Sequence, residues 1–214
     1  FMEAMQPFVN WKNQKGIPTT IVNVTTIGNN TTSIKNYIQT QYNLNDGLTF
    51  VLLVGDATQI VTPSAAGGSS DPSYALLEGN DNYPDIFVGR FSAENVTQVQ
   101  TQVIKTVHYE RDLVSGDWLK KGMGIASEEG AGIGDNGESD WQHMDYIRND
   151  LLNYTYSTVD QVYATNGGNA TTITNNVNYG RSEICYCGHG SATIWVTTGY
   201  SNSNVNALTN DWKL

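Results

Sequence analysis

Basic residues are scarce in this chain of 214 residues. It has 11 Lys and Arg against 21 Asp and Glu, which gives a formal net charge of -10. A field of that sign repels phosphate backbones and anionic lipid headgroups. Nucleic acid and membrane surfaces are therefore not the expected partners.

Cysteine is nearly absent, and so are long apolar runs. Cys185 and Cys187 are the two cysteines; one residue apart on a strand, they share a face, and a disulfide between them would be strained. No run reaches the length of a membrane span, and Phe1 opens neither a signal peptide nor an anchor, so any targeting segment would lie outside this chain or have been removed. Only 15% of residues are charged, while Asn, Thr, Gly and Tyr are abundant, which favours a secreted bacterial protein.

Hydrophobic periodicity in the first half predicts alternating strands and helices. Helical spacing covers residues 1–14 and 32–42, and β-branched residues predict a strand over 19–27. The apolar run 48–54 is typical of a parallel strand buried on both faces. Two short strands, 74–77 and 86–88, are expected to form a hairpin with an acidic tip.

The pattern restarts after a long helix that begins at Ser92. Its buried stripe is expected to contain five valines: Val96, Val99, Val103, Val107 and Val114. Strands are then predicted over 123–127, 156–162 and 182–187, and helices over 138–152 and 171–177. The sequence thus predicts an α/β fold, with an N-terminal subdomain over residues 1–110 and a second subdomain over 111–214.

His189 lies between two glycines directly after the last predicted strand. Glycine lets the backbone turn sharply there, and the carboxyl end of a strand is where α/β sheets place their ligands. The imidazole is therefore well placed for a general base. Taken alone, Gly188-His189-Gly190 favours a structural turn histidine with no catalytic role, so the interpretation depends on the rest of the chain.

Six segments, in the same order along the chain, resemble the gingipain family of caspase-like cysteine peptidases. These six collinear segments are residues 8–16, 51–56, 79–83, 87–92, 108–111 and 135–140 with Gln142-His143. Gly188-His189-Gly190 follows them and also matches the family. The resemblance covers nearly the whole chain. It implies a three-layer α/β sandwich of two similar subdomains with a mostly parallel sheet, the second subdomain being catalytic.

The resemblance also implies roles for individual residues. His189 would deprotonate the nucleophilic cysteine and protonate the leaving amine, and the Gly190 amide would help to hold the oxyanion. Glu129, which aligns better than Glu128, would orient His189, although a loop cap is an open alternative. Asp140 would lie at the floor of the pocket for an arginine before the scissile bond, or else be a solvated residue in the first turn of a helix.

The nucleophile itself is expected beyond Leu214, because the family places it some thirty residues after the histidine. A second chain of the same precursor is one way to supply it. Cys187 is the alternative within the chain, but the turn at Gly188 is expected to separate it from His189, and a buried apolar role is favoured for both cysteines.

A calcium site is implied by a group of oxygen donors in the first half, and no His or Cys lies among them to favour zinc. Its members are Asp56, Asp81 and Asp85 with the carbonyls of Glu78 and Tyr83. A solvated acidic turn is the alternative. Glu138 and His143 coincide with family residues near a second ion, but a spacing of five places them about 140° apart on one helix, so we expect no shared ligand.

The function implied is that of a secreted or cell-surface bacterial cysteine endopeptidase with protein or peptide substrates and no organic cofactor. Preference for Arg before the scissile bond depends on Asp140. Two alternatives are a sortase-like transpeptidase of the same family and a catalytically silent surface binding module. The endopeptidase and the transpeptidase would both use His189, and the expected nucleophile lies beyond Leu214, so these residues do not separate the three functions.

Overall fold

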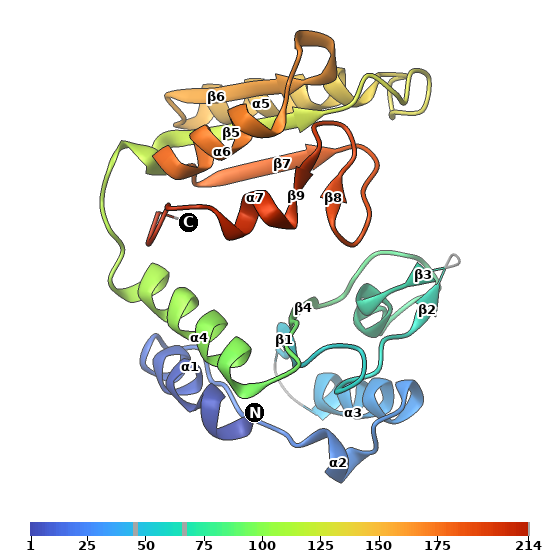
Figure 1. Ribbon diagram of the computed structural model, residues 1–214. Helices are drawn as coiled ribbons and strands as arrows, with labels where there is room; N and C mark the ends of the chain where they lie inside the picture. Colours follow the sequence, from blue (N-terminus) through green and yellow to red (C-terminus); the bar gives the residue numbers. More distant parts are fainter. Residues whose placement is uncertain (45–46, 66–67, 214) are drawn as a thin grey trace. The chain divides into compact units, whose positions relative to one another are not determined.

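The computed structural model describes residues 1–44, 47–65 and 68–213, which form two compact units, Phe1–Asp112 and Leu113–Leu214 (Figure 1). The sequence prediction places this division between residues 110 and 111. Each unit has a parallel sheet covered by helices on both faces, and each is described here by itself.

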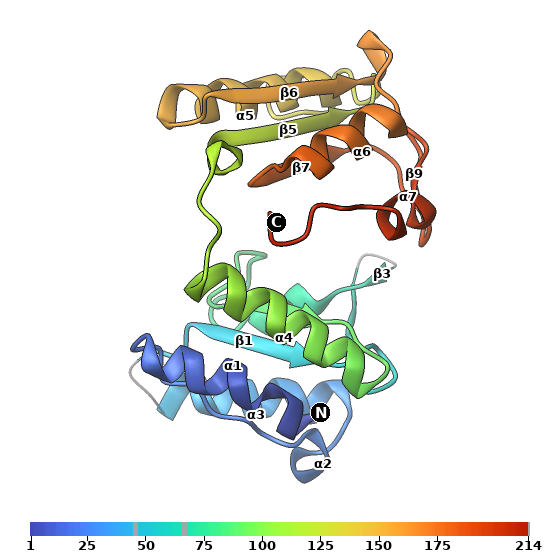
Figure 2. The same ribbon diagram turned by 60° about the vertical axis from the view of Figure 1, so that its left-hand side comes forward.

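Unit 1 has a two-stranded parallel sheet of β1 (Phe50–Val54) and β4 (Phe87–Phe91), with Leu52 opposite Gly89. Helices α1 (Met2–Gln14) and α4 (Val96–Arg111) pack on one face, and α3 (Thr31–Leu44) packs on the other (Figure 2). The smaller elements are α2 (Val24–Ile27), β2 (Ser64–Ala65), β3 (Gly68–Ser69) and the 3₁₀ helix η1 (Asp71–Ala75).

Alternation along β1 explains this layering. Leu52 and Val54 pack into a cluster with Val99 and Val103 of α4, whereas Leu53 packs against α3 on the other side of the sheet. Successive strand residues point to opposite faces, so an apolar run such as 50–54 has to be covered twice. The predicted strand is confirmed over Phe50–Val54 and packs against helices on both faces, but Phe50 is exposed and only Leu53 is fully buried.

Unit 2 is built on a three-stranded parallel sheet in the order β6 (Thr158–Tyr163), β5 (Lys121–Ala126), β7 (Glu183–Cys187). Helix α5 (Asp140–Tyr154) covers one face and α6 (Ala170–Tyr179) the other. The smaller elements are η2 (Asp117–Lys120), η3 (Ala164–Asn166), β8 (Ile194–Trp195), β9 (Tyr200–Ser201) and α7 (Asn202–Asn206).

The central strand β5 shows why the helices lie so close. Met123 and Ile125 pack with Ile173 of α6, and Ala126 packs with Met144 of α5. A Cβ at Gly124 would come within 2.5 Å of Met144 Cγ, so glycine is what allows α5 to approach the sheet. The predicted three-layer α/β architecture with mostly parallel pairing is confirmed, the exceptions being the short antiparallel pairs β2–β3 and β8–β9.

Two predicted strands are wrong. Residues 19–27 form no strand; the chain is irregular up to Asn23, whose side chain accepts a hydrogen bond from Thr25 N–H and starts α2. Residues 74–77 do not pair with 86–88, because Tyr74 lies in η1 with its ring fully buried, and β4 pairs with β1 instead. Burial of one large ring outweighed the local strand preference of the segment.

Helix α4 begins at Val96 with Asn95 as its N-cap, four residues later than predicted. Val99, Val103 and Val107 are buried as expected. Val96 and Val114 are exposed, the latter because the helix ends at Arg111 and Val114 lies outside it. Within the described residues, no helix has the length and apolar character that crossing a membrane requires.

Candidate functional site

The turn after β7 depends on glycine at position 188. Gly188 has φ +156°, and a Cβ there would lie 2.6 Å from Thr197 Oγ1 and 2.9 Å from Tyr186 Oη. Real Cβ atoms do not come that close to other atoms, so a side chain at position 188 would displace Thr197 and Tyr186, whose hydroxyls bond to each other. The glycine before His189 is therefore a requirement of packing as well as of backbone freedom.

The backbone of His189 is held firmly while its side chain faces solvent. Tyr186 Oη donates to the His189 carbonyl at 2.6 Å, and Val196 N–H donates to the same oxygen at 2.9 Å. The Tyr186 ring stacks on Trp195, with centroids 4.8 Å apart and planes at 8°. The imidazole itself is 80% exposed, so the site combines a fixed base with free access.

Glu129 lies against His189, as the resemblance implies. Glu129 Oε2 is 3.0 Å from His189 Nε2. A neutral imidazole has one ring nitrogen that donates a hydrogen bond and one that can accept a proton. An exposed imidazole beside a carboxylate is an arrangement that general-base chemistry can use.

The amide of Gly190 is not used by the hairpin that follows. Gly190 forms an antiparallel bridge with Trp195, and the two ladder bonds come from its neighbours, Val196 N–H to His189 O and Ser191 N–H to Ile194 O. This is the non-hydrogen-bonded kind of pair, in which the central residue's own N–H points away from the partner strand. The Gly190 N–H is therefore available to an external acceptor.

Asp140 is the first residue of α5 and is half-buried. Ser127 Oγ donates to its Oδ2 at 2.6 Å, and the Asp140 N–H donates to the Glu129 carbonyl at 3.0 Å. Asp140 is therefore fixed beside the loop that carries Glu129. Asp140 also lies in the first turn of α5, as the alternative expects, and its side chain is half-buried.

Cys187 is the last residue of β7, two positions before His189. Both cysteines are free, and they share the α5 face of β7, where they pack with Met144. Burial and, after it, Asp140 raise the pKa of the Cys187 thiol, and burial and Glu183 raise the pKa of Cys185 to about 11. Thiols of this kind are poor nucleophiles at neutral pH, which agrees with an apolar packing role.

The five predicted calcium ligands are all in unit 1, after β1 and in the loop before β4. Asp85 accepts two backbone hydrogen bonds at Oδ2, from Leu77 N–H at 2.6 Å and Glu78 N–H at 2.8 Å. The amide of Glu78, followed by that of Leu77, lowers the pKa of the Asp85 carboxyl. Asp85 is thus ionised and already holds the loop.

The other acidic side chains also bond to nearby backbone. Asp81 Oδ1 accepts from Tyr83 N–H at 2.9 Å, and Asp56 Oδ1 accepts from Ala57 N–H at 2.8 Å. Over residues 1–44, 47–65 and 68–213, no three His, Cys, Asp or Glu side chains gather closely enough for a metal ion. The donors have the chemistry that calcium prefers, but the structure does not assemble them into one shell, and calcium stays a prediction.

Glu138 and His143 do meet, against the expectation from helical spacing. Glu138 Oε1 is 2.9 Å from His143 Nδ1, and the Glu138 side chain is 3% exposed. The spacing argument fails because α5 begins at Asp140, so Glu138 precedes the helix and its side chain folds back. His143, followed by two backbone amides, lowers the pKa of the Glu138 carboxyl.

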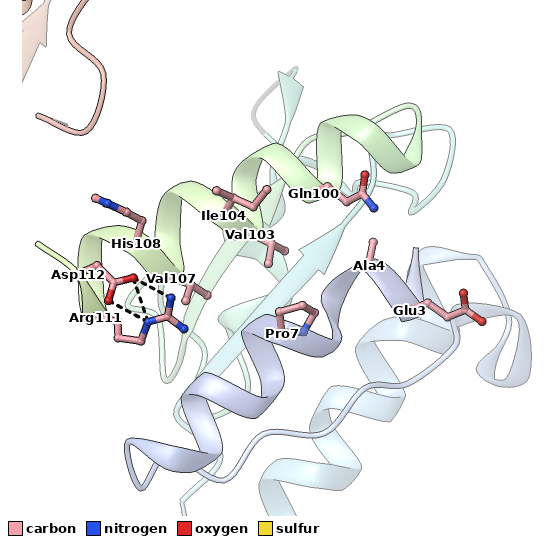
Figure 3. A pocket seen from close by; sticks show the side chains of 10 residues that line it. All are labelled: Glu3, Ala4, Pro7, Gln100, Val103, Ile104, Val107, His108, Arg111 and Asp112. Atoms are coloured by element: carbon pink, nitrogen blue, oxygen red, sulfur yellow. Dashed lines mark hydrogen bonds and ion pairs between the residues drawn. The ribbon is translucent and has the colours of Figure 1, made fainter.

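A separate groove lies on unit 1 between α1 and α4 (Figure 3). Its apolar wall includes Pro7, Val103 and Val107, and Arg111 pairs with Asp112 at one end, 2.7 Å apart. None of the predicted catalytic, specificity or calcium residues lines it. We therefore place the candidate site at the carboxyl end of the unit 2 sheet.

The sequence argument missed three residues of this site: Ser127, Tyr186 and Trp195. Ser127 directly follows β5, and the rule that ligands lie at the carboxyl ends of strands points to it. Tyr186 and Trp195 are nine positions apart, and their rings stack because the hairpin of β8 and β9 folds back toward β7. No sequence pattern indicates this contact.

Comparison with known proteins shows which family the chain resembles. Residues 1–214 match the profile of peptidase family C25. The chain is 38% identical over 218 residues to gingipain R2 of Porphyromonas gingivalis, covering 100% of this chain and 30% of the relative. It is 28% identical over 223 residues to Lys-gingipain W83 of the same organism, covering 98% of this chain and 12% of the relative.

Solved structures agree with the sequence comparison. The crystal structure of the Arg-specific cysteine proteinase gingipain R superposes with a TM-score of 0.92 at 37% identity, over 100% of this chain and 50% of that one. The complex of the pro- and mature domains of Porphyromonas gingivalis RgpB gives a TM-score of 0.92 at 38% identity, over 100% and 51%. The chain thus spans between 12% and 51% of the length of these relatives. On the full-length family match and these identities, the chain belongs to peptidase family C25.

Proposed function

We propose that this chain is the base-bearing part of a cysteine endopeptidase that cleaves after arginine. The observation that carries the proposal is the pair formed by His189 Nε2 and Glu129 Oε2, 3.0 Å apart, at the open end of the unit 2 sheet. Membership of family C25 and the printed activity of the gingipain R relative support the same reaction.

In the proposed reaction, the nucleophilic thiol comes from another part of the full-length protein. His189 takes the thiol proton, and the thiolate attacks the carbonyl carbon of the scissile peptide bond. The oxyanion that forms accepts a hydrogen bond from Gly190 N–H, which the hairpin leaves available. His189 then gives its proton to the leaving amine, and water hydrolyses the thioester.

Asp140 is the proposed contact for the arginine side chain. A guanidinium presents a planar fork of donors that matches a carboxylate, and a fixed carboxylate makes that match selective. Asp140 is half-buried and held by Ser127. Relatives bearing the names gingipain R2 and Lys-gingipain are 38% and 28% identical to the chain, which also supports arginine.

The test uses the full-length protein and two fluorogenic peptides that differ only in Arg or Lys before the scissile bond. We expect cleavage of the Arg peptide to exceed that of the Lys peptide by at least about tenfold. Asp140→Asn is expected to abolish this preference, whereas Asp150→Asn, an exposed carboxylate on the same helix, leaves it unchanged. Equal cleavage of both peptides would overturn the assignment of Asp140.

The same assay separates hydrolysis from transfer. Adding a peptide amine as acceptor produces a ligated product only if the enzyme intermediate is attacked by amine in preference to water. A ligated product as the main species would indicate a transpeptidase. No reaction with either substrate, together with no labelling by a thiol-directed peptidyl inhibitor, would indicate a silent binding module.

We also infer the setting in which the protein works. Its substrates are proteins or peptides, its cysteine comes from the same precursor, and it is secreted or held at a bacterial cell surface. The low charge content and net charge of -10 support the last point, and the complex of pro- and mature RgpB domains supports a propeptide as a further partner. Intact mass of the natural protein and fractionation of its source cells test both.

A further inference from the structure

The Ser127 hydroxyl lies between the carboxylate of Asp140 and the backbone of Glu129. Ser127 follows β5 directly and is 6% exposed. Its N–H donates to the Cys187 carbonyl at 3.0 Å, which ties its backbone to the end of β7. The hydroxyl is therefore presented from the rigid sheet rather than from the loop.

The directions of its hydrogen bonds are determined by the partners. Asp140 Oδ2, 2.6 Å away, can only accept, so the Ser127 hydroxyl proton points to it. The oxygen of the same hydroxyl accepts from Glu129 N–H at 3.0 Å. Asp140 N–H in turn donates to the Glu129 carbonyl at 3.0 Å, which closes a ring of three hydrogen bonds.

This ring determines where the Asp140 carboxylate points. The short bond from Ser127 holds Oδ2, and a Cβ at Gly130 would be only 2.7 Å from Oδ1, so the loop backbone lies close on the other side. Hydrogen bonds from hydroxyl to carboxylate of this length are strong and orienting. The hydrogen bond from Ser127 therefore restricts rotation of the carboxylate, and the Gly130 backbone limits the space on its other side.

We propose that Ser127 is a positioning residue that sets the orientation of Asp140 and so determines selectivity for arginine over lysine. This rests on the proposed function. A guanidinium needs a carboxylate in one orientation to form two parallel hydrogen bonds, whereas an ammonium is a point charge that tolerates a rotated carboxylate. Losing the Ser127 hydroxyl therefore harms arginine binding more than lysine binding.

The experiment compares Ser127→Ala with the natural full-length enzyme on the paired Arg and Lys peptides. We expect KM for the Arg peptide to rise about tenfold, as for loss of one hydrogen bond to a charged group, with kcat within about twofold. The Lys peptide should change by less than about twofold. Ser127→Thr, which keeps the hydroxyl, should restore the Arg preference.

A matched control is Ser182→Ala, which removes another serine hydroxyl of unit 2. Ser182 Oγ donates to the Leu119 carbonyl at 3.1 Å, at the opposite end of the sheet. If Ser127 has only a structural role, both alanine variants lower the melting temperature and leave the ratio of Arg to Lys cleavage unchanged, which would overturn the inference. If the natural enzyme shows no Arg preference, the proposed function fails first, and the inference fails with it.

Discussion

Arg90 in unit 1 and His189 in unit 2 both face a carboxylate, but the two pairs are built in opposite ways. Arg90 Nε lies 2.7 Å from Asp71 Oδ2, with side chains 13% and 23% exposed. The guanidinium also donates to Gly55 O at 2.7 Å and to Thr62 Oγ1 at 3.0 Å. His189 and Glu129 make one contact, at 80% and 62% exposure.

The difference distinguishes an ion pair that stabilises the fold from one that is open to a substrate. A half-buried pair whose guanidinium donors are all bonded has none left for a substrate, and the pair contributes to the stability of the fold. An exposed pair contributes little to stability, but its imidazole keeps one nitrogen that can accept a proton. The number of unused donors and acceptors is therefore a better guide to function than the presence of an ion pair.

The largest expected effect is on the exposed pair, in activity alone. His189→Ala in the full-length enzyme should reduce kcat/KM by on the order of 10⁴-fold, because the general base is lost. The melting temperature should stay within about 1 °C, since surface substitutions cost little. Retention of more than a hundredth of the activity would contradict the assignment of His189 as the base.

The next largest effect is expected for the half-buried pair of Arg90 and Asp71, and it should change stability and not activity. Arg90→Met should destabilise unit 1 by about 3 kcal/mol, because Asp71 is left half-buried without its partner. Arg111→Met is the control, since the Arg111–Asp112 pair is 54% and 45% exposed and should cost less than about 0.5 kcal/mol. Denaturant unfolding measures both, and equal losses would remove the contrast between the pairs.

The pH dependence of the half-buried pair should be smaller but directional. The hydrogen bond from Arg90 lowers the pKa of Asp71 below its usual value. A carboxyl with a depressed folded pKa contributes stability that is fully present above its unfolded pKa, about 3.9, and is lost as pH falls through the folded pKa.

Unfolding at a series of pH values tests this sign. The stability difference between the natural protein and Asp71→Asn should be constant from pH 7 to about 5 and should shrink below about pH 4. Glu94→Gln is a control at an exposed carboxyl in the same unit. A difference that grows as the solution becomes more acidic would show that the pair does not stabilise the fold in this way.

The smallest effect is expected from calcium at the loop that precedes β4. Its carboxylates bond to backbone amides and do not form one shell, so binding has to reorganise the loop and is expected to be weak. Removing calcium with a chelator should lower stability by about 1 kcal/mol, as for a ligand at a few times its Kd. Asp81→Asn should lose this dependence, and a melting temperature that does not respond to chelator would contradict the prediction.

Particular elements show how far sequence reasoning reached. The strands at 50–54 and 183–187 were predictable because their apolar pattern is strong and has one interpretation. The strand predicted at 74–77 failed because Tyr74 is buried in a 3₁₀ turn, where its hydroxyl donates to the Val61 carbonyl at 2.8 Å. That bond joins residues 13 apart and leaves no trace in local periodicity.

The candidate site divides in the same way. Gly188-His189-Gly190 and the resemblance pointed to the base, to Glu129 and to Asp140. The pairing of Glu138 with His143 was mispredicted, since a shift of two residues in the start of α5 takes Glu138 off the helix. Helix boundaries are the least certain feature of a sequence prediction, and a spacing argument fails with them.

The amino-acid sequence by itself determined the alternation of strands and helices, the glycine turn around His189 and the position of His189 at the carboxyl end of a strand, because these depend on residues close together along the chain. Only the tertiary structure decided that His189 Nε2 lies beside Glu129, that Ser127 links Glu129 to Asp140, and that Arg90 forms an ion pair with Asp71. These contacts join residues 60, 13 and 19 positions apart or lie across loops, and their distances follow from how the sheets pack rather than from any local pattern.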